Sequence, residues 1–174
     1  ALKLGLRLGE HAASGRDKLT LLLSPGIEPL GTWIEQMLSE STGKEGRGIV
    51  PIVNESSRLP QQYGSDRVFA AVIAKEDETL TARCRELEAA GQPVFRSMTG
   101  DPDDIGGEFF RWEFVTAVAG AVLGINPFDE PDVGRSKSTT SLLLSGKEVA
   151  GQEALTPCIQ DGELSLAGKP ERFQ

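Results

Sequence analysis

Short apolar runs alternate along the chain with segments of helical periodicity, and this alternation constrains the fold more than any other feature. The apolar runs are residues 19–23, 48–53, 68–74 and 93–98. Strands of nearly continuous hydrophobicity that are separated by helices form a parallel sheet covered on both faces. The sequence therefore predicts an α/β fold, with ligands expected at the carboxyl ends of the strands, near helix termini.

Two of the strand candidates carry positional information. The run Val68–Ala74 is uninterrupted and rich in residues that favour strands, so it is the strongest candidate. Pro51 cannot donate a hydrogen bond to a neighbouring strand. The run 48–53 is therefore expected at an edge of the sheet or at the end of a strand.

Apolar residues recur at helical spacing in several segments between and after the strands. The segments are residues 4–13, 27–38, 80–88, 103–124 and 132–144. The first is expected to end near Gly15 and the third at Gly91. Asp101, Pro102 and Asp103 suit the first turn of the fourth.

The fourth segment contains the longest apolar tract, residues 109–125. Arg111 and Glu113 lie within this tract, and Pro127 follows it. A membrane-spanning helix needs about 20 predominantly apolar residues, so the tract is expected to be a buried helix instead. The two charges are expected to pair with neighbours inside the fold.

The composition fits a single soluble domain and excludes several kinds of site. Of 174 residues, 39% are hydrophobic and 25% are charged, and the net charge is −8. This balance argues against sequence-independent nucleic-acid binding, which needs clustered cations. His11 is the only histidine, which excludes a multi-histidine metal site, and it is expected on the surface. Cys84 and Cys158 have neither zinc-site nor disulfide spacing, which fits a reducing cytoplasm.

The last part of the chain, residues 146–174, has little periodicity. It is expected to be a linker or partial element that leads to an absent region, with a turn and a short strand at 161–166. The chain begins without methionine and stops abruptly at Gln174. It is therefore expected to be a fragment of a longer polypeptide.

The first candidate site is the segment 39–48, between a predicted helix and a predicted strand. It combines hydroxyl groups and glycines with Lys44 and Arg47, which together suit an anion. Glu40 lies at the helix C-terminus, where the helix dipole disfavours negative charge, and this makes it a candidate proton acceptor. The alternative is an ordinary helix-to-strand connection with a glycine cap. The segment is not a Walker A motif, because Leu38 and Glu45 occupy positions that the motif reserves for other residues.

The second candidate site is the segment 120–137, where the buried helix ends at glycine and a turn begins at Asn126-Pro127. Acidic residues and Lys137 follow, at the start of another helix. Polar groups at the end of a buried helix are costly unless they have a role. The alternative is a capped helix break followed by a turn.

The two segments together resemble phosphoglucose isomerases. Residues 40–44, Glu-Ser-Thr-Gly-Lys, are similar to the family's Glu-Ser-Asn-Gly-Lys stretch. The second segment is similar to the family's C-terminal signature: Trp112-Glu113, Gly120, Asn126, Phe128-Asp129-Glu130, Val133 and Lys137. The motifs lie about 90 residues apart in the family's order, and the resemblance covers about residues 1–145. Residues 33–36, 45–48 and 109–113 most resemble the isomerase part of bacterial transaldolase–phosphoglucose isomerase fusions.

The resemblance implies a second sugar isomerase (SIS) domain over residues 1–145, a flavodoxin-like three-layer αβα sandwich with about five parallel strands. The family interconverts glucose 6-phosphate and fructose 6-phosphate without metal or organic cofactor. Glu40 matches the base that moves a proton between C1 and C2 through a cis-enediol, and Lys137 matches a lysine near the sugar ring oxygen. The two side chains are therefore expected to face each other across one shared pocket. The substrate-binding residues implied are Ser41, Thr42, Gly43, Lys44 and Glu130.

Several departures from the family pattern qualify this expectation. Glu130 replaces a glutamine, Asp132 and Gly134 replace a glycine and a glutamate, and the ring-opening histidine has no counterpart. The family's phosphate-binding hydroxyls belong to a first SIS domain, which these residues lack. The chain alone is therefore expected to be inactive. The first SIS domain of the same polypeptide is its expected partner, and the sequence leaves open whether the protein forms a homodimer. The alternative is a non-catalytic SIS module that binds a phosphosugar; a nucleotide-binding fold is disfavoured because no Gly-x-Gly-x-x-Gly follows a strand.

Overall fold

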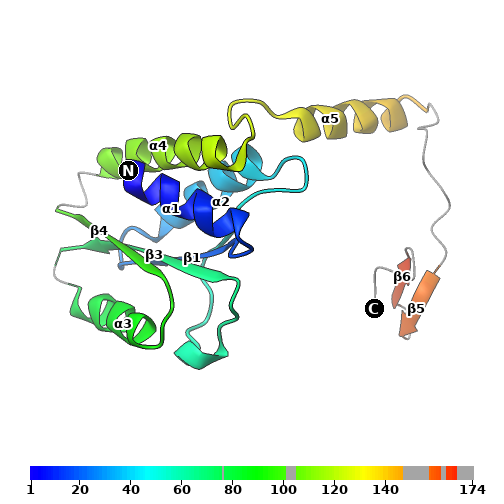
Figure 1. Ribbon diagram of the computed structural model, residues 1–174. Coiled ribbons are helices and arrows are strands. Elements are labelled where there is room, and N and C mark those ends of the chain that lie inside the picture. The colour runs from blue at the N-terminus through cyan, green and yellow to red at the C-terminus, as the bar shows by residue number, and fades with distance from the viewer. Residues whose placement is uncertain (76, 101–104, 147–156, 162–163, 168–174) are drawn as a thin grey trace. The chain divides into compact units, whose positions relative to one another are not determined.

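The computed structural model describes residues 1–75, 77–100 and 105–146, and the backbone of the strands at 157–161 and 164–167. The chain forms two compact units, Ala1–Glu130 and Pro131–Gln174. The elements of the first unit are α1 (Leu2–Ala13), β1 (Lys18–Leu23), α2 (Glu28–Thr42), β2 (Val50–Ile52), the 3₁₀ turn η1 (Pro60–Gln62), β3 (Arg67–Ala74), α3 (Glu78–Ala89), β4 (Val94–Thr99) and α4 (Ile105–Leu123) (Figure 1).

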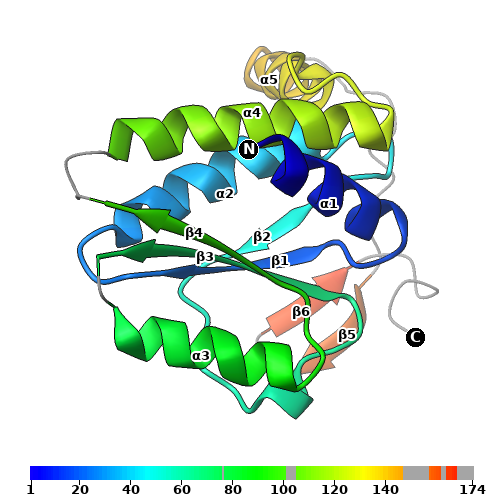
Figure 2. The same ribbon diagram turned by 60° about the vertical axis from the view of Figure 1, so that its left-hand side comes forward.

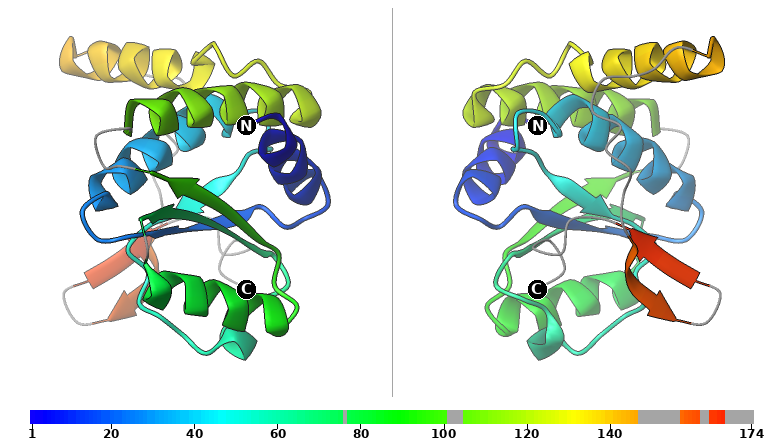
Figure 3. Two further views of the ribbon diagram at one scale, coloured as in Figure 1. Left: turned by 90° about the vertical axis from the view of Figure 1, so that its left-hand side faces the viewer. Right: turned by 90° about the vertical axis from the view of Figure 1, so that its right-hand side faces the viewer.

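The first unit is a three-layer αβα sandwich, as the sequence predicts. Its sheet has the strand order β2-β1-β3-β4, and every pairing is parallel. Helices α1, α2 and α4 cover one face and α3 lies on the other (Figures 2 and 3). Strand β2 lies at an edge, in agreement with the expectation from Pro51. Within the described residues this sheet has four strands, where the resemblance implies about five.

Alternation along β3 places its side chains in two separate cores. Val68, Ala70 and Val72 pack in the larger core with residues of α1, α2 and α4. Ala71 and Ile73 pack with Cys84 of α3 in the smaller one. Because both faces of the strand are covered, the run is apolar throughout, which explains why it is the clearest strand in the sequence.

Helices α1 and α4 approach each other closely because two glycines of α1 face α4. A Cβ atom on Gly5 would lie 2.7 Å from Cβ of Val118, and one on Gly9 would lie 2.6 Å from Cβ of Val122. Both distances are shorter than van der Waals contact. The glycines are therefore required by packing and not by backbone conformation.

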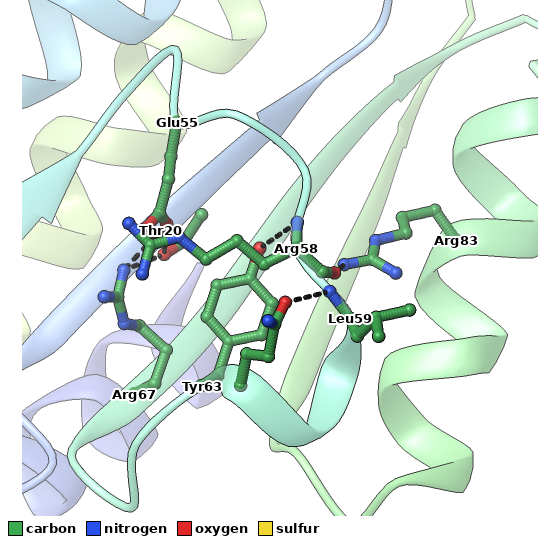
Figure 4. A network of polar contacts seen from close by, with 8 residues as sticks. Thr20, Glu55, Arg58, Leu59, Tyr63, Arg67 and Arg83 are labelled. Atoms are coloured by element: carbon green, nitrogen blue, oxygen red, sulfur yellow. Dashed lines mark hydrogen bonds and ion pairs between the residues drawn. The ribbon is translucent and has the colours of Figure 1, made fainter.

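The connection from β2 to β3 contains only η1 among its described elements, and a polar network holds it to the sheet (Figure 4). Nη1 of Arg67 lies 2.8 Å from the Glu55 carboxylate and donates to Oγ1 of Thr20 in β1. The Tyr63 ring packs edge-on against Phe69 of β3, with ring centroids 4.9 Å apart. Arg83 of α3 donates to the Arg58 carbonyl. These contacts anchor the connection on the α3 side.

The charges in the long helix α4 are arranged differently from the sequence prediction. Arg111 pairs with Glu108 one turn earlier, with Nε and Oε1 3.0 Å apart, whereas Glu113 is exposed. Glu108 is the buried member of the pair, at 3% exposure. The prediction identified the wrong glutamate because the two lie on different faces of the helix, and the apolar tract began after Glu108.

His11 also differs from the surface position expected from the sequence. Its ring is half-buried, with its centroid 6.0 Å from that of Phe95. Partial burial, followed by the nearby charges of Arg16 and Arg7, lowers the pKa of the imidazole. The contact with Phe95 packs the C-terminal part of α1 against β4.

The second unit contains α5 (Pro131–Leu144) and an antiparallel pair of strands, β5 (Pro157–Asp161) and β6 (Leu164–Ala167). The helix agrees with the prediction, and the strand expected within 161–166 corresponds to β6. Strand β5 was missed because its sequence lacks alternation. The helix start expected at 101–103 lies outside the described residues. Within those residues, none of the helices has both the length and the apolar character needed to cross a membrane.

Candidate functional site

The segment 39–48 joins the last turn of α2 to the start of β2 at the amino edge of the sheet. Glu40 is exposed, and Oε1 accepts a long hydrogen bond of 3.4 Å from Nε2 of Gln36 on the preceding turn. Ser41 is half-buried, and Gly43 follows the helix. Ligands were expected at the carboxyl edge, but a helix that follows a strand in this topology ends at the opposite edge. The exposed Glu40 carboxylate therefore lies at the amino edge of the sheet.

Thr42 fixes this helix end to the next strand. It is fully buried, and its hydroxyl donates to the Leu38 carbonyl at 2.7 Å and accepts from the Ile49 amide at 2.9 Å. The hydroxyl therefore acts as both donor and acceptor within the fold. Thr42 thus positions the backbone on either side of Glu40 and Lys44.

The two sequence motifs meet in space through Lys44. Its Nζ atom donates to the Asn126 carbonyl at 2.7 Å and to the Asp129 carbonyl. The same atom lies 3.0 Å from Oδ1 of Asp129. Although 85 residues separate Lys44 from Asp129, the structure places them in direct contact.

Arg47, a second cation of the segment 39–48, holds the end of α4. Nη1 of Arg47 donates to the Leu123 carbonyl, one of the terminal carbonyls that the helix itself leaves unpaired. Gly124 follows with a φ of +70°, and a Cβ there would lie 3.3 Å from the same guanidinium atom. A Cβ on Gly120 would lie 2.9 Å from the Pro127 ring. Gly124 therefore allows Arg47 of the first segment to approach closely, and Gly120 allows Pro127 of the turn to pack against α4.

The helix ends of this region border a cavity of about 810 Å³. Its lining includes Ser39, Gly43 and Arg47 from the first segment, and Val122 and Leu123 from the end of α4. Residues 12–13 at the end of α1 complete one side. Three helix C-termini surround the cavity, and backbone carbonyls at such termini accept hydrogen bonds from hydroxyl groups. Because Asp17 and Arg47 also line the cavity, it suits a polar group that can both donate and accept hydrogen bonds.

The remaining predicted site residues lie near and beyond the boundary between the two units. Glu130 is exposed and is the last residue of the first unit. Lys137 is exposed on α5 in the second unit, where Arg135 pairs with Asp132 at 3.4 Å. That Lys137 faces Glu40 stays a prediction. Sequence reasoning missed Asp129 and Arg47 as links between the motifs, because only their tertiary contacts distinguish them from ordinary surface charges.

Potential metal ligands are scattered among the side chains that the structure describes. Among those residues, no group of three or more histidine, cysteine, aspartate or glutamate side chains is arranged to hold an ion. The groups at the amino edge include the Glu40 carboxylate, the Arg47 guanidinium, and backbone and hydroxyl groups. This set suits proton transfer and hydrogen bonding.

Comparison with known proteins identifies a distant relationship. No family model matches the sequence. A glucose-6-phosphate isomerase of Rubrobacter xylanophilus is 27% identical over 168 aligned positions, which cover 74% of this chain and 39% of that protein. Glucose-6-phosphate isomerases of Heliobacterium modesticaldum and Leptospira biflexa are 26% and 24% identical and cover 80% and 82% of the chain. This chain is a distant homologue of glucose-6-phosphate isomerases. It spans about two-fifths of the length of these relatives.

The fold is also found in a solved structure. A hypothetical protein from Thermus thermophilus superposes on 83% of this chain and 45% of its own, with a TM-score of 0.67 and 21% sequence identity. At that identity the likeness concerns the architecture alone. It agrees with the αβα sandwich of the first unit.

Proposed function

We propose that this chain is the second SIS domain of a glucose-6-phosphate isomerase, and that it supplies the base for proton transfer between C1 and C2 of the sugar. The single observation that supports this best is homology to these isomerases over most of the chain, with Glu40 exposed at the end of α2. A transaldolase fused to the same polypeptide is part of the proposal.

In this proposal Glu40 takes the proton from one carbon and returns it to the neighbouring carbon through a cis-enediol. One carboxylate serves both steps, because the group that has accepted the proton is then the acid that donates it. Lys137 donates a proton to the ring oxygen or stabilises negative charge that develops there during ring opening. Of the substrate-binding residues that the resemblance implies, Ser41, Gly43 and Glu130 line the substrate in this proposal. The Thr42 hydroxyl and the Lys44 ammonium are instead used within the fold.

In this proposal, these residues do not supply the phosphate-binding part of the site. The chain spans about two-fifths of the relatives' length, and phosphate binding is assigned to a first SIS domain. The isolated 174-residue chain is accordingly expected to give negligible turnover of fructose 6-phosphate in a coupled assay of glucose 6-phosphate formation. Turnover near that of a complete isomerase would contradict this division of roles.

The decisive experiment is Glu40→Gln in the full-length protein, with Glu35→Gln on the same helix as the matched control. Loss of a general base lowers turnover by about 10²–10⁴-fold. Because the amide keeps the shape of the carboxylate, substrate affinity is expected to stay within about threefold. Turnover and solvent proton exchange at C1 and C2 are measured together. An unchanged rate in Glu40→Gln removes this residue from the proposed role.

Glu130 favours one alternative, a non-catalytic module that binds a phosphosugar. The resembling family has glutamine here, and an additional carboxylate repels an anionic substrate. This alternative predicts that an enediol analogue binds the full-length protein without Glu40-dependent proton exchange. Exchange that disappears in Glu40→Gln would exclude it.

A further inference from the structure

The ammonium group of Lys44 has no donor left for a ligand. An ammonium carries three N–H donors, and three acceptors surround Nζ: the carbonyls of Asn126 and Asp129 and the Asp129 carboxylate. The side chain is 5% exposed. A substrate anion would have to displace one of these partners and enter a closed environment. The charge of Lys44 is therefore used inside the fold.

The turn that Lys44 contacts is braced by its own side chains. Oδ1 of Asn126 accepts from the Phe128 amide at 3.1 Å, and its Nδ2 atom donates to Oδ2 of Asp129 at 3.1 Å. Arg47 binds the Leu123 carbonyl at the entrance to this turn. The turn is thus a preformed unit, and Lys44 and Arg47 attach it to the end of α2 at two points.

We infer that Lys44 is a positioning residue, which holds the Glu40 end of α2 in fixed register with the turn 124–129 that leads to Glu130. The inference rests on the proposed function, in which Glu40 is the base. Proton transfer requires the base within hydrogen-bond reach of the carbon acid, and small displacements lower the rate steeply. Glu40 lies only four positions from Lys44 and makes only a long hydrogen bond itself, so its position depends on the backbone that Lys44 anchors.

The kinetic test compares Lys44→Met with Lys18→Met in the full-length protein. Lys18 also lies at the amino edge and pairs with Asp17 and Asp66, but it is 38% exposed. For Lys44→Met we expect kcat to fall about 10-fold to 100-fold with KM within about threefold, and Lys18→Met to match the unmodified protein. A large rise in KM with unchanged kcat would mean direct contact with substrate and would overturn the inference.

Asp129→Asn provides a milder variant that keeps both carbonyl acceptors. It removes the ion pair from a half-exposed residue, so the protein is expected to fold. We expect kcat to fall about threefold to tenfold.

Lys44→Arg keeps the charge but not the compact three-donor geometry. Rescue by arginine to the unmodified kcat would show that charge alone matters, and would contradict the positioning role.

Amide hydrogen exchange separates this inference from the proposed function. In Lys44→Met we expect exchange to rise at least about tenfold in both 43–49 and 124–129, and to stay unchanged in Lys18→Met. Unchanged exchange in both segments overturns the positioning role even if the protein is an isomerase. If the unmodified protein shows no isomerase activity, the proposed function fails, and the exchange result alone decides whether Lys44 joins the two segments.

Discussion

The guanidinium of Arg67 lies 2.8 Å from the carboxylate of Glu55, and the two side chains are only 13% and 12% exposed. The pair joins the start of β3 to the connection that leaves β2, and Thr20 of β1 shares it (Figure 4). This connection covers part of the α3 face of the sheet. The largely buried ion pair thus holds this connection in the position that a helix takes in other strand–helix–strand units of such a fold.

Removal of one member of this pair is expected to destabilise the fold more than removal of both. Arg67→Met leaves Glu55 charged and poorly solvated, which costs about 3 kcal/mol of unfolding free energy. Combining it with Glu55→Leu is expected to restore most of that loss, because two apolar groups then pack together. Urea unfolding of both variants measures the effect.

Lys18→Met is the control for this prediction, since it breaks an exposed pair of the kind that contributes about 0–1 kcal/mol. Equal destabilisation by Lys18→Met and Arg67→Met would show that burial of the Arg67 pair has no energetic consequence.

Gly9→Ala is expected to separate α1 from α4. The added methyl group would overlap Val122, so the helices must shift, at about 1–3 kcal/mol of stability. Gly107→Ala on α4 is the control, because nothing lies within 4 Å of its Cβ position. There the helix propensity of alanine is expected to stabilise the protein by about 0.5–1 kcal/mol. Thermal unfolding of the two variants in parallel checks the opposite signs; destabilisation by both would argue against the steric explanation.

Asp77 caps α3 and is expected to make stability depend on acid pH. Its carboxylate accepts hydrogen bonds from the Leu80 amide at 2.9 Å and the Ser24 hydroxyl at 2.7 Å. The Leu80 bond first, and then the Ser24 bond, lower the pKa of Asp77 below its ordinary value of 3.8. A carboxyl whose pKa falls on folding stabilises the protein above its unfolded pKa, and this contribution is lost as pH falls through the folded value.

Asp77→Ala is therefore expected to cost about 1 kcal/mol at pH 7, within the usual range for helix caps. The difference from the unmodified protein should shrink below about pH 4, where Asp77 becomes protonated first in the unfolded and then in the folded state. Unfolding free energies at about pH 7 and about pH 3 test this, with Asp77→Asn as a variant that retains an acceptor for the cap. A difference that is the same at both pH values would show that the charge of Asp77 has no part in the effect.

The sequence predicted the architecture because the architecture depends on local pattern. The uninterrupted apolar run of β3 and the helical spacing of α2 are features of burial, and the edge position of β2 follows from the missing amide of Pro51. The need for glycine at Gly5 and Gly9 could not be predicted, since it arises only where α4 approaches α1.

From the residues alone, the candidate site could be predicted only as two separate motifs, which the family resemblance then joined. The sequence pointed to Glu40 and to the turn at Asn126 but assigned the charge of Lys44 to an anionic ligand. Its contacts with Asp129 depend on how α2 and α4 end beside each other, which no local pattern encodes. The same reasoning explains Glu108, whose burial is set by the helix face on which it lies.

The two borders of the parallel sheet, its edge strands β2 and β4, differ in how many backbone groups they leave free to pair with a strand of another molecule. At one border, β2 is three residues long and carries Pro51, so few backbone groups are free to pair. At the other, β4 presents six residues with one side unpaired in the described sheet, and Met98 there is 62% exposed. Long, open, partly apolar borders are where β proteins self-associate. Aggregation of this domain at high concentration should therefore start along β4 and leave the Pro51 border unaffected.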